Sequence, residues 1–562
     1  MTEFTIQFIP LRNNLFVRFV KFYLPVFIFS LLISIPLLIP YIHPGYFPTH
    51  DGEWAVVRLS DMFRTLRDLQ IPARYSGNLN FGFGYPLFNF TYPFPYYLGV
   101  GIHMLGLGFV ETVKLMFAVT IPVSAFFMFL ASQKIWGNNW AGIISSVLYL
   151  YFPYRLVDLF VRGSIGESFA FMLFPIVLFS LASLLKNPGS MLFKLLGGVS
   201  YAILITSHNI MGILFTLTLG LFFIGSLRKK DIELFKNYLF VVISGLGLSA
   251  FFWIPALLEK GNILLSLVPI ADRNLYFVNI IQLLSSPWGY GTPTDSVNPF
   301  TYQIGWPFLL ILSLTLIIFG LRRFGVLKKA ADEKLAAVLF IGIFIFAFLL
   351  FKESRIIWKL PLLSEINYPW VVLSQLGLIA SVLAGFLSNF KYFKILGFAV
   401  VMLSLALYIP FSKPSNYVDR GEGFYFTNDA TTTSSNELMP VWVKKQPIER
   451  QQEEVEILAG QGNIENVLSS SKAVSFSVVM KEDGIVRINT IYYPGWNLKI
   501  NGVEKEINYN NDMGLMEFEL PRGQHMVSAS FSETPLRMVS NIISVFTLFA
   551  LAFLGIKKLW KL

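Results

Sequence analysis

Residues 22–42 read FYLPVFIFSLLISIPLLIPYI, and this stretch decides the class of the fold. It carries no charged side chain and has the length of about 20 residues that a helix needs to cross a bilayer. Similar runs recur along the chain, such as WPFLLILSLTLIIFG at 306–320. Of the 562 residues, 54% are hydrophobic and 14% are charged, whereas about a quarter of the residues of soluble domains are charged. The sequence therefore predicts a polytopic α-helical membrane protein.

The remaining composition excludes several kinds of function. The formal net charge is +10, but basic residues of membrane proteins gather in cytoplasmic loops, where they set orientation. We therefore expect no nucleic-acid partner. The chain has no cysteine, which excludes disulfides, thiol catalysis and thiolate metal sites. The first apolar run is too long for a signal-peptide core and lacks a clear cleavage site, so we expect an uncleaved anchor.

The basic residues fall into clusters that predict how the chain threads the membrane. If every cluster is cytoplasmic, an even number of helices separates successive clusters. Pairs of apolar runs fit between them, which predicts about twelve transmembrane helices and two cytoplasmic termini. The clusters are Arg12/Arg18/Lys21, Lys134, Lys186/Lys194, Arg228/Lys229/Lys230/Lys236, Arg322/Arg323/Lys328/Lys329/Lys334, Lys391/Lys394 and Lys557/Lys558/Lys561. The paired runs are 22–42 with 111–132, 140–154 with 166–185, 195–207 with 210–227, 237–257 with 303–321, 335–351 with 369–388, and 395–411 with 537–555.

This threading requires that YYLGVGIHMLGLGF at 96–109 does not span the membrane. The stretch is short and rich in glycine, which favours an interfacial or re-entrant segment. The connecting segments that the threading places on the outer face then hold nearly every cluster of unusual polar residues. These segments are 43–110, 155–165, 207–209, 259–302, 352–367 and 412–536.

The first outer loop, 43–110, begins with an amphipathic pattern. Apolar residues recur at three- and four-residue steps from Ala55 to Leu69, and the opposite face carries Arg58, Asp61, Arg64 and Asp68. The pattern predicts a helix that lies on the membrane surface. An aromatic stretch rich in Gly and Pro follows, NLNFGFGYPLFNFTYPFPYY at 78–97. We expect this stretch to pack on the outer helix ends and to shape a pocket, with Tyr85 as a substrate contact.

The composition becomes polar after residue 411 and predicts a separate outer domain. Short alternating runs such as AVSFSVVM and GLMEFELP stand between turn signals, which predicts a small antiparallel β-sandwich. The predicted organisation is a membrane domain over 1–411, a mainly-β domain over 412–536, and a last helix with a basic tail over 537–562. The β-domain could cover a catalytic cleft, help to admit an acceptor, or only stabilise the protein.

Several stretches together carry a resemblance to a known superfamily. They are HDGEWAVVRL (50–59), FGFGYPLFNFTYPFPYYLG (81–99), FPYRLVDLFVRGSIGES (152–168) and SHN (207–209). The first half of the chain resembles the GT-C superfamily of membrane glycosyltransferases, and within it the membrane proteins described as 6-pyruvoyl-tetrahydropterin synthase-related. YYPGWNLKING at 492–502 looks like the β-domain of YfhO-like proteins. The resemblance implies a GT-C-like fold, a polyprenyl- or dolichyl-phosphate-linked sugar donor, and an essential Asp or Glu in the first outer loop.

Asp51 is our candidate for that acidic residue. An aspartate has an ordinary pKa near 3.9, so at neutral pH it can accept the proton of an acceptor hydroxyl. Glu53 could share this role or, with Asp51 and His50, hold a divalent metal such as Mg²⁺ or Mn²⁺, although no metal is certain. The local alternative is that Asp51 only caps the helix that follows it.

The second outer loop, 155–165, supplies candidates for binding the donor phosphate. Arg155 and Arg162 could hold a lipid phosphate, because guanidinium groups bind phosphate with paired hydrogen bonds. The alternative is a pair of interfacial salt bridges, Arg155 with Asp158 and Arg162 with Glu167. Glu167 is a further substrate-binding candidate, with a role at the N-terminus of the following helix as its alternative.

Three more candidates complete the predicted substrate site. His208 could contact phosphate or sugar, or it could be an ordinary turn histidine, since Ser-His-Asn is a common turn composition. Arg58 lies on the polar face of the first-loop helix and is a candidate contact. Trp288 could stack on a sugar ring, although tryptophan also favours membrane interfaces for other reasons.

The sequence therefore predicts a glycosyltransferase, hexosyl or pentosyl, on the outer face of a plasma membrane. Its expected partners are a polyprenyl-phosphate-linked sugar, membrane lipid, and an acceptor that is a glycan, a lipid or a protein. One rival is a non-catalytic protein that binds lipid-linked glycan or assists envelope assembly. A transporter is the other rival. The spanning helices of a transporter would be expected to carry ionisable residues along a pathway, whereas the apolar runs of this sequence are nearly free of charge.

Overall fold

The computed structural model of the protein describes residues 19–559, except 228–231, 293, 296, 298, 329 and 331. Seven residues of the predicted basic clusters lie outside the described residues: Arg12, Arg18, Arg228, Lys229, Lys230, Lys329 and Lys561. The principal helices are α2 (Leu24–Ile42), α3 (Gly52–Arg67), α4 (Leu87–Phe90), α5 (Phe94–His103), α6 (Phe109–Trp136), α7 (Asn139–Leu150), α8 (Pro153–Val157), α9 (Ile165–Lys186), α10 (Met191–Ser207), α11 (Asn209–Ser226), α12 (Ile232–Leu248), α13 (Ala250–Leu258), α14 (Ile280–Leu284), α15 (Trp306–Arg323), α16 (Glu333–Leu349), α17 (Leu373–Ala384), α18 (Lys391–Tyr408), α19 (Gly421–Phe426) and α20 (Pro535–Leu559).

The helical bundle is that of a multi-pass membrane protein. Within the described ranges, eight helices are long and apolar enough to cross a membrane, and three bent helix pairs raise the number to at most eleven. The bends are 47° between α7 and 153–162, 71° between α12 and α13, and 94° between α16 and 352–359. Helix α10 is apolar but has only 17 residues. The predicted count of twelve stays a prediction, as does the orientation of the bundle.

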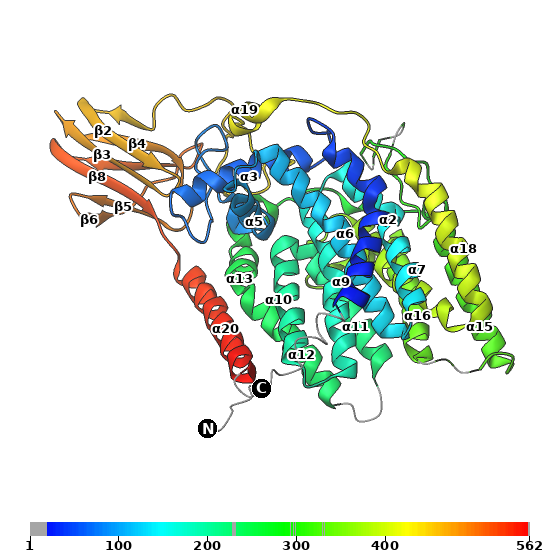
Figure 1. Cartoon of the computed structure of the whole chain (residues 1–562). Coiled ribbons are helices and arrows are strands. Elements are labelled where there is room, and N and C mark those ends of the chain that lie inside the picture. The colour runs from blue at the N-terminus through cyan, green and yellow to red at the C-terminus, as the bar shows by residue number, and fades with distance from the viewer. Residues whose placement is uncertain are drawn as a thin grey trace, which may run out of the picture.

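Short elements gather at one end of the bundle. Figure 1 shows α3, α5 and α19 at the same end as the β-strands. Backbone bridges join segments that are far apart in the sequence there, Tyr46 with Val418 and Ile263 with Pro440. Helix α5 has 10 residues and rises only about 15 Å, half of the about 30 Å of a bilayer core. This length agrees with the expectation that 96–109 does not span.

The chain after residue 454 forms two antiparallel sheets. One has the strand order β1-β4-β7 and the other β2-β3-β8-β5-β6. Alternate residues of the strands are buried, as in β3, because side chains of a strand point to opposite faces in turn. The packing of the two sheets as a sandwich stays a prediction. The strands are β1 (Val455–Ala459), β2 (Gly462–Ser470), β3 (Ala473–Met480), β4 (Gly484–Ile491), β5 (Trp496–Ile500), β6 (Val503–Lys505), β7 (Leu515–Leu520) and β8 (Gly523–Phe531).

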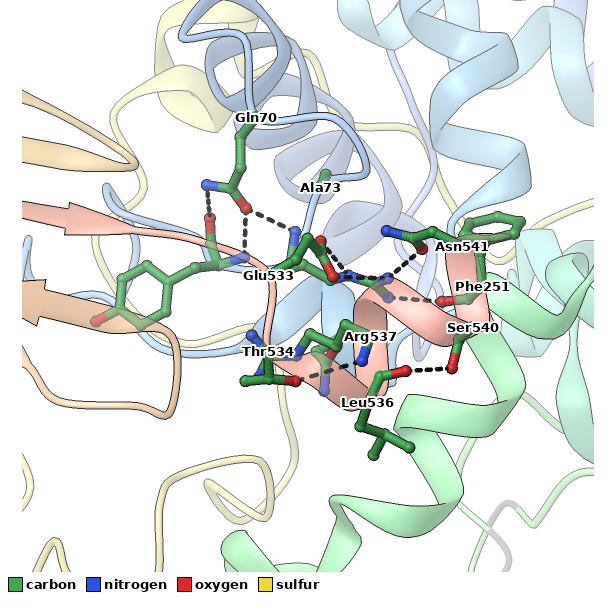
Figure 2. A network of polar contacts seen from close by, with 12 residues as sticks. Gln70, Ala73, Phe251, Glu533, Thr534, Leu536, Arg537, Ser540 and Asn541 are labelled. Carbon is green, nitrogen blue, oxygen red and sulfur yellow. Dashed lines mark hydrogen bonds and ion pairs between the residues drawn. The ribbon is translucent and has the colours of Figure 1, made fainter. Parts of the chain in front are cut away.

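Buried ionic contacts join the β-region, the first loop and α20. Arg74 of the first loop pairs with Glu533 at 3.1 Å and also donates to the Phe251 carbonyl and to Asn541. Arg537 of α20 donates to Glu259 Oε2 from two nitrogens, at 3.0 and 2.8 Å. Figure 2 shows Glu533, Arg537 and Asn541 at this junction. These contacts hold the first loop and the sheets in one position over the bundle end.

Candidate functional site

Asp51 lies at the start of α3, where the first loop crosses the end of 158–162. Its backbone N–H donates to the Arg162 carbonyl at 2.7 Å, and the His50 N–H donates to the Val161 carbonyl at 3.0 Å. Gly163 follows with a φ of +62°, and a Cβ there would lie 2.1 Å from Thr49 Oγ1. Glycine at this position thus permits both the left-handed turn and the close approach of the two loops.

The side chain of Asp51 does not cap α3, although the residue occupies the N-cap position. The Thr49 hydroxyl instead accepts from the Gly52 N–H at 3.0 Å. The carboxylate of Asp51 is thereby left to interact with other groups. The alternative considered from the sequence, in which the Asp51 side chain caps the helix, is therefore not observed.

Asp51, Arg162 and Glu167 form an ionic cluster. One nitrogen of Arg162, Nη2, lies 2.7 Å from Glu167 and 3.5 Å from Asp51. The guanidinium also lies over the Trp370 ring, 4.4 Å from its centroid, and the Tyr154 hydroxyl donates to Glu167 at 2.7 Å. The Glu167 side chain is 1% exposed and that of Asp51 is 34% exposed. Glu167 therefore holds the arginine from the buried side, and Asp51 is the carboxylate of this cluster that is open to solvent.

The other two candidates of the first outer loop, Glu53 and His50, contact different partners. Glu53 lies 3.3 Å from Arg420 and accepts from the Tyr425 hydroxyl at 3.4 Å. His50 Nε2 lies 3.2 Å from the Tyr290 carbonyl. No group of three potential ligands is found among the described residues. Because Asp51, Glu53 and His50 contact different partners, their arrangement does not fit the divalent metal considered from the sequence.

Arg155 is enclosed by protein. Its side chain is fully buried and pairs with Asp158 at 3.0 Å. The other terminal nitrogen donates to the Thr120 hydroxyl at 3.0 Å, and Ser168 donates to Asp158 at 2.7 Å. The structure thus places Arg155 in the salt bridge that was the alternative to phosphate binding. Its role as a phosphate ligand stays a prediction.

A large apolar cavity opens beside this cluster, and we refer to it as the lipid-side cavity. Its volume is about 820 Å³, within the about 300–1,000 Å³ of small-molecule pockets. Apolar side chains from α10, α11, α13 and the 360–363 segment form most of its wall. Polar groups also line it, among them Arg58, Tyr92 and His208.

His208 connects the lipid-side cavity to the ionic cluster. Its Nδ1 accepts from the Met211 N–H at 3.3 Å, which caps α11 and assigns the ring proton of the neutral form to Nε2. The imidazole stacks on Tyr92 with the centroids 5.3 Å apart. Burial lowers the pKa of His208 to about 4, aided by Arg162 and opposed by Glu167 and Asp51. The ring is therefore neutral at pH 7 and can donate a hydrogen bond from Nε2.

Arg58 and Tyr85 meet the 412–436 segment at Thr432. Arg58 Nε donates to the Thr432 hydroxyl at 3.0 Å, and Nη2 donates to the Thr432 carbonyl. The Tyr85 hydroxyl lies 3.2 Å from the same Thr432 hydroxyl. Burial raises the pKa of Tyr85 to about 12, so its hydroxyl stays protonated at neutral pH. Arg58 lines the lipid-side cavity, whereas Tyr85 contacts Thr432 without lining the cavity.

Trp288 is not part of the lipid-side cavity wall. Its ring stacks on Phe411 with the centroids 4.7 Å apart.

The sequence analysis did not identify two residues of this region, Tyr92 and Thr432. Tyr92 lies in the aromatic stretch that predicted a pocket, so its residue type was a usable signal. Nothing in the sequence around Thr432 indicates that it meets Arg58.

The comparisons with known proteins give structural neighbours only. No family model matches the chain, and neither does any curated protein. The structure is similar to the arabinofuranosyltransferase AftD from Mycobacteria, with 17% identity and a TM-score of 0.43 over 70% of this chain and 26% of that one. It is also similar to the oligosaccharyltransferase AglB from Archaeoglobus fulgidus in complex with an inhibitory peptide and a dolichol-phosphate, with 13% identity and a TM-score of 0.44 over 75% of this chain and 61% of that one.

By their descriptions, the first neighbour is an arabinofuranosyltransferase and the second an oligosaccharyltransferase. The chain spans about a quarter of the length of the first and about three fifths of the length of the second.

Proposed function

We propose that the protein is a membrane glycosyltransferase that moves a sugar from a polyprenyl-phosphate donor to an acceptor hydroxyl. The reaction takes place at the bundle end that carries α3. This end lies on the outer face of a plasma membrane, and both termini are cytoplasmic. The acceptor is a glycan, a lipid or a protein hydroxyl, and the sugar is a hexose or a pentose.

The observation that carries the proposal is that a reachable carboxylate lies near a large apolar cavity. Asp51 shares Arg162 with Glu167. Gly166, the residue before Glu167, lies so close to Tyr92 of the lipid-side cavity that a Cβ there would be 2.6 Å from the Tyr92 ring. A polyprenyl chain matches the apolar wall, since burial of apolar surface favours binding by about 25 cal/mol per Å². Its phosphate would meet the polar residues of that wall, and the sugar would extend from there toward Asp51.

The proposed chemistry is a single in-line displacement. Asp51 takes the proton of the acceptor hydroxyl, whose oxygen forms a bond to the anomeric carbon of the donor. The bond between that carbon and the phosphate oxygen breaks, and its electron pair leaves with the polyprenyl phosphate. Arg58 and the Nε2–H of His208 offer donors to the departing anion. Arg162 orients the Asp51 carboxylate through the 3.5 Å ion pair between them.

The test compares sugar transfer by the purified full-length protein and two variants. The substrates are a panel of polyprenyl-phosphate sugars with released polyprenyl phosphate as the readout. Asp51→Asn is expected to reduce turnover by about 100-fold or more, the usual contribution of a general base. Glu53→Gln is the matched control, because it neutralises a carboxylate two residues away that points toward Arg420.

Equal turnover by wild type and Asp51→Asn would remove Asp51 from the chemistry. If wild type binds a lipid-linked sugar tightly but transfers nothing, the non-catalytic binding function replaces the proposal. Retained binding by Asp51→Asn with lost turnover supports it.

A further inference from the structure

One wall of the lipid-side cavity ends at a buried carboxylate. Helix α13 contributes four side chains to that wall, Phe252, Trp253, Ala256 and Leu257. Lys260 also lines the cavity, and Glu259 stands between it and the helix, at the C-cap position of α13. The Glu259 side chain is only 8% exposed, and it points away from the cavity lining toward other partners. The position of this wall therefore depends on what Glu259 contacts.

The carboxylate of Glu259 accepts hydrogen bonds from distant parts of the chain. Two nitrogens of Arg537 donate to Oε2 at 3.0 and 2.8 Å, and the Thr534 hydroxyl donates to Oε1 at 3.1 Å. The Tyr493 hydroxyl lies 3.5 Å from Oε2, and the Asn89 amide donates to the same oxygen at 2.8 Å. Tyr493 follows β4 and Thr534 follows β8. A single carboxylate thus joins the cavity wall to the β-region and to α20.

Two further stretches of the cavity wall are fixed by the same surroundings. Asn89, which donates to Glu259, directly precedes residues 90–92, and these three residues line the cavity. Leu265 also lines it, and the Leu265 N–H donates to the Glu437 carbonyl at 2.8 Å. Glu437 belongs to the segment that leads into the first strand, and it is itself part of the wall. The parts of the wall near Glu259 are therefore held together with the docked β-region.

Arg74 ties the other end of α13 to the same junction. It donates to the Phe251 carbonyl at 2.8 Å and to Asn541 of α20 at 3.1 Å, and it pairs with Glu533 at 3.1 Å (Figure 2). Phe251 is the second residue of α13, and the next residue lines the cavity. Arg74 is 1% exposed and Arg537 is fully buried. Each end of α13 is thus connected to the junction by one buried arginine.

These connections make the cavity wall and the docking of the β-region dependent on each other. If the β-region separates from the bundle, both ends of α13 lose their partners and the wall gains freedom. A ligand that must order a loose wall binds more weakly than one that meets an ordered wall. The effect of one site on binding at another is reciprocal. A ligand in the cavity is therefore expected to stabilise the docked position of the β-region.

We propose that Glu259 is a positioning residue through which docking of the β-region and lipid binding in the lipid-side cavity favour each other. The inference rests on the part of the proposed function that places a polyprenyl phosphate in this cavity, and it requires no sugar transfer. It gives the β-region a role in holding the lipid donor in addition to stabilising the fold.

The first test measures lipid affinity of the full-length protein in detergent. The probe is geranylgeranyl phosphate, a prenyl phosphate without sugar, and binding is followed by tryptophan fluorescence because Trp253 lines the cavity. Glu259→Gln is expected to weaken the affinity by about fivefold or more, the lower end of usual couplings between sites. Glu517→Gln is the matched control, because Glu517 pairs with Arg487 at 2.6 Å within the three-stranded sheet and does not line the cavity. Its affinity is expected to equal that of wild type.

Hydrogen exchange measures the docking of the β-region separately. The Ser532 N–H donates to the Gly495 carbonyl at 2.8 Å beside the junction, so peptides that cover 492–497 and 531–538 report its opening. Saturating geranylgeranyl phosphate is expected to slow their exchange severalfold in wild type and to have no effect in Glu259→Gln. If Glu259 were only a structural contact, its loss would speed this exchange without changing the lipid affinity.

Thr534→Val and Thr547→Val form a milder pair of variants in case Glu259→Gln does not fold. The Thr534 hydroxyl donates to Glu259, whereas the Thr547 hydroxyl donates to the Ile543 carbonyl within α20. Thr534→Val is expected to weaken lipid binding by about twofold, since only one neutral donor is lost. Thr547→Val is expected to leave lipid binding unchanged.

Equal lipid affinity of wild type, Glu259→Gln and Thr534→Val would overturn the inference, and so would junction exchange that does not respond to the lipid. If geranylgeranyl phosphate does not bind wild type at all, the inference and the proposed donor site both fail. Lipid binding with the expected coupling but without sugar transfer from any donor would support the inference and refute only the proposed reaction.

Discussion

The substitution Asp61→Asn is expected to stabilise the protein above pH 6, although it removes a charged residue from a buried helix face. Burial raises the pKa of Asp61 from its ordinary value of 3.8 to about 6, and Asp68 adds to the increase while Ser76 and Arg64 oppose it. Between pH 3.8 and about pH 6 the Asp61 carboxyl of the native state holds a proton that the unfolded state has released. Wild-type stability therefore falls as the pH rises through this window, and the full penalty is present above pH 6.

The size of the effect follows from the shift. About two pKa units at 1.36 kcal/mol each give about 3 kcal/mol of stability that Asp61→Asn recovers at pH 7.5. At pH 4 the wild-type carboxyl is largely protonated in the native state, so variant and wild type are expected to unfold at nearly the same temperature. An asparagine has almost the same shape, so the substitution creates no cavity.

The assay is thermal unfolding of wild type and Asp61→Asn at pH 7.5 and pH 4, followed by tryptophan fluorescence. Glu482→Gln, an exposed position in the turn between β3 and β4, controls for the loss of one negative charge. The reasoning is refuted if Asp61→Asn unfolds at a lower temperature than wild type at pH 7.5, or if its advantage is the same at both pH values.

Three further substitutions test the buried ionic groups. Arg162→Ala is expected to destabilise the fold by about 3–5 kcal/mol, because it leaves Glu167 buried without its cation. Chemical denaturation measures this loss, and an unchanged denaturation midpoint would contradict the prediction. Glu259→Ala leaves Arg537 unpaired and is expected to expose the β-region junction to protease at concentrations that spare wild type; equal cleavage of both would argue against that role. His208 has its pKa lowered to about 4 from 6.5, so its native ring binds fewer protons than the unfolded one and wild-type stability falls as the pH drops from 6.5 toward 4. His208→Gln is expected to reduce that acid sensitivity, and an identical pH dependence of the two unfolding temperatures would exclude His208 as its source.

The membrane helices and most strands could be predicted from local patterns. Long apolar runs located the helices, and alternation located β3 exactly where AVSFSVVM stands, because both signals arise within one element. Strands β1 and β2 were missed. Strand β1 directly follows the charged stretch 448–454. Strand β2 is largely exposed, so the alternation that marks a half-buried strand is weak there.

The candidate site could be predicted only in part, because its contacts join residues that are far apart in the sequence. Residue types and the loop position pointed to Asp51, but its neighbour Arg162 lies 111 residues away. The helix pattern placed Asp61 on a polar face, whereas the structure buries it because the β-region covers that face. Leu69 was assigned to the apolar face and is 71% exposed, because α3 ends at Arg67 before reaching it.

The junction in Figure 2 has a consequence for the order in which the protein is assembled. Arg74 and Glu533 lie 459 residues apart, and Arg537 follows Glu259 by 278 residues. At about 5–20 residues per second, synthesis takes at least about 20 seconds to pass from Arg74 to Glu533 and at least about 14 seconds to pass from Glu259 to Arg537. During that interval Arg74 has no ionic partner in the β-region. The face of α3 that carries Asp61 is likewise covered by residues from 450 onward, after most of the bundle has been synthesised. Ribosome-bound chains that stop before residue 450 should therefore leave Asp61 more open to solvent than in the full-length protein.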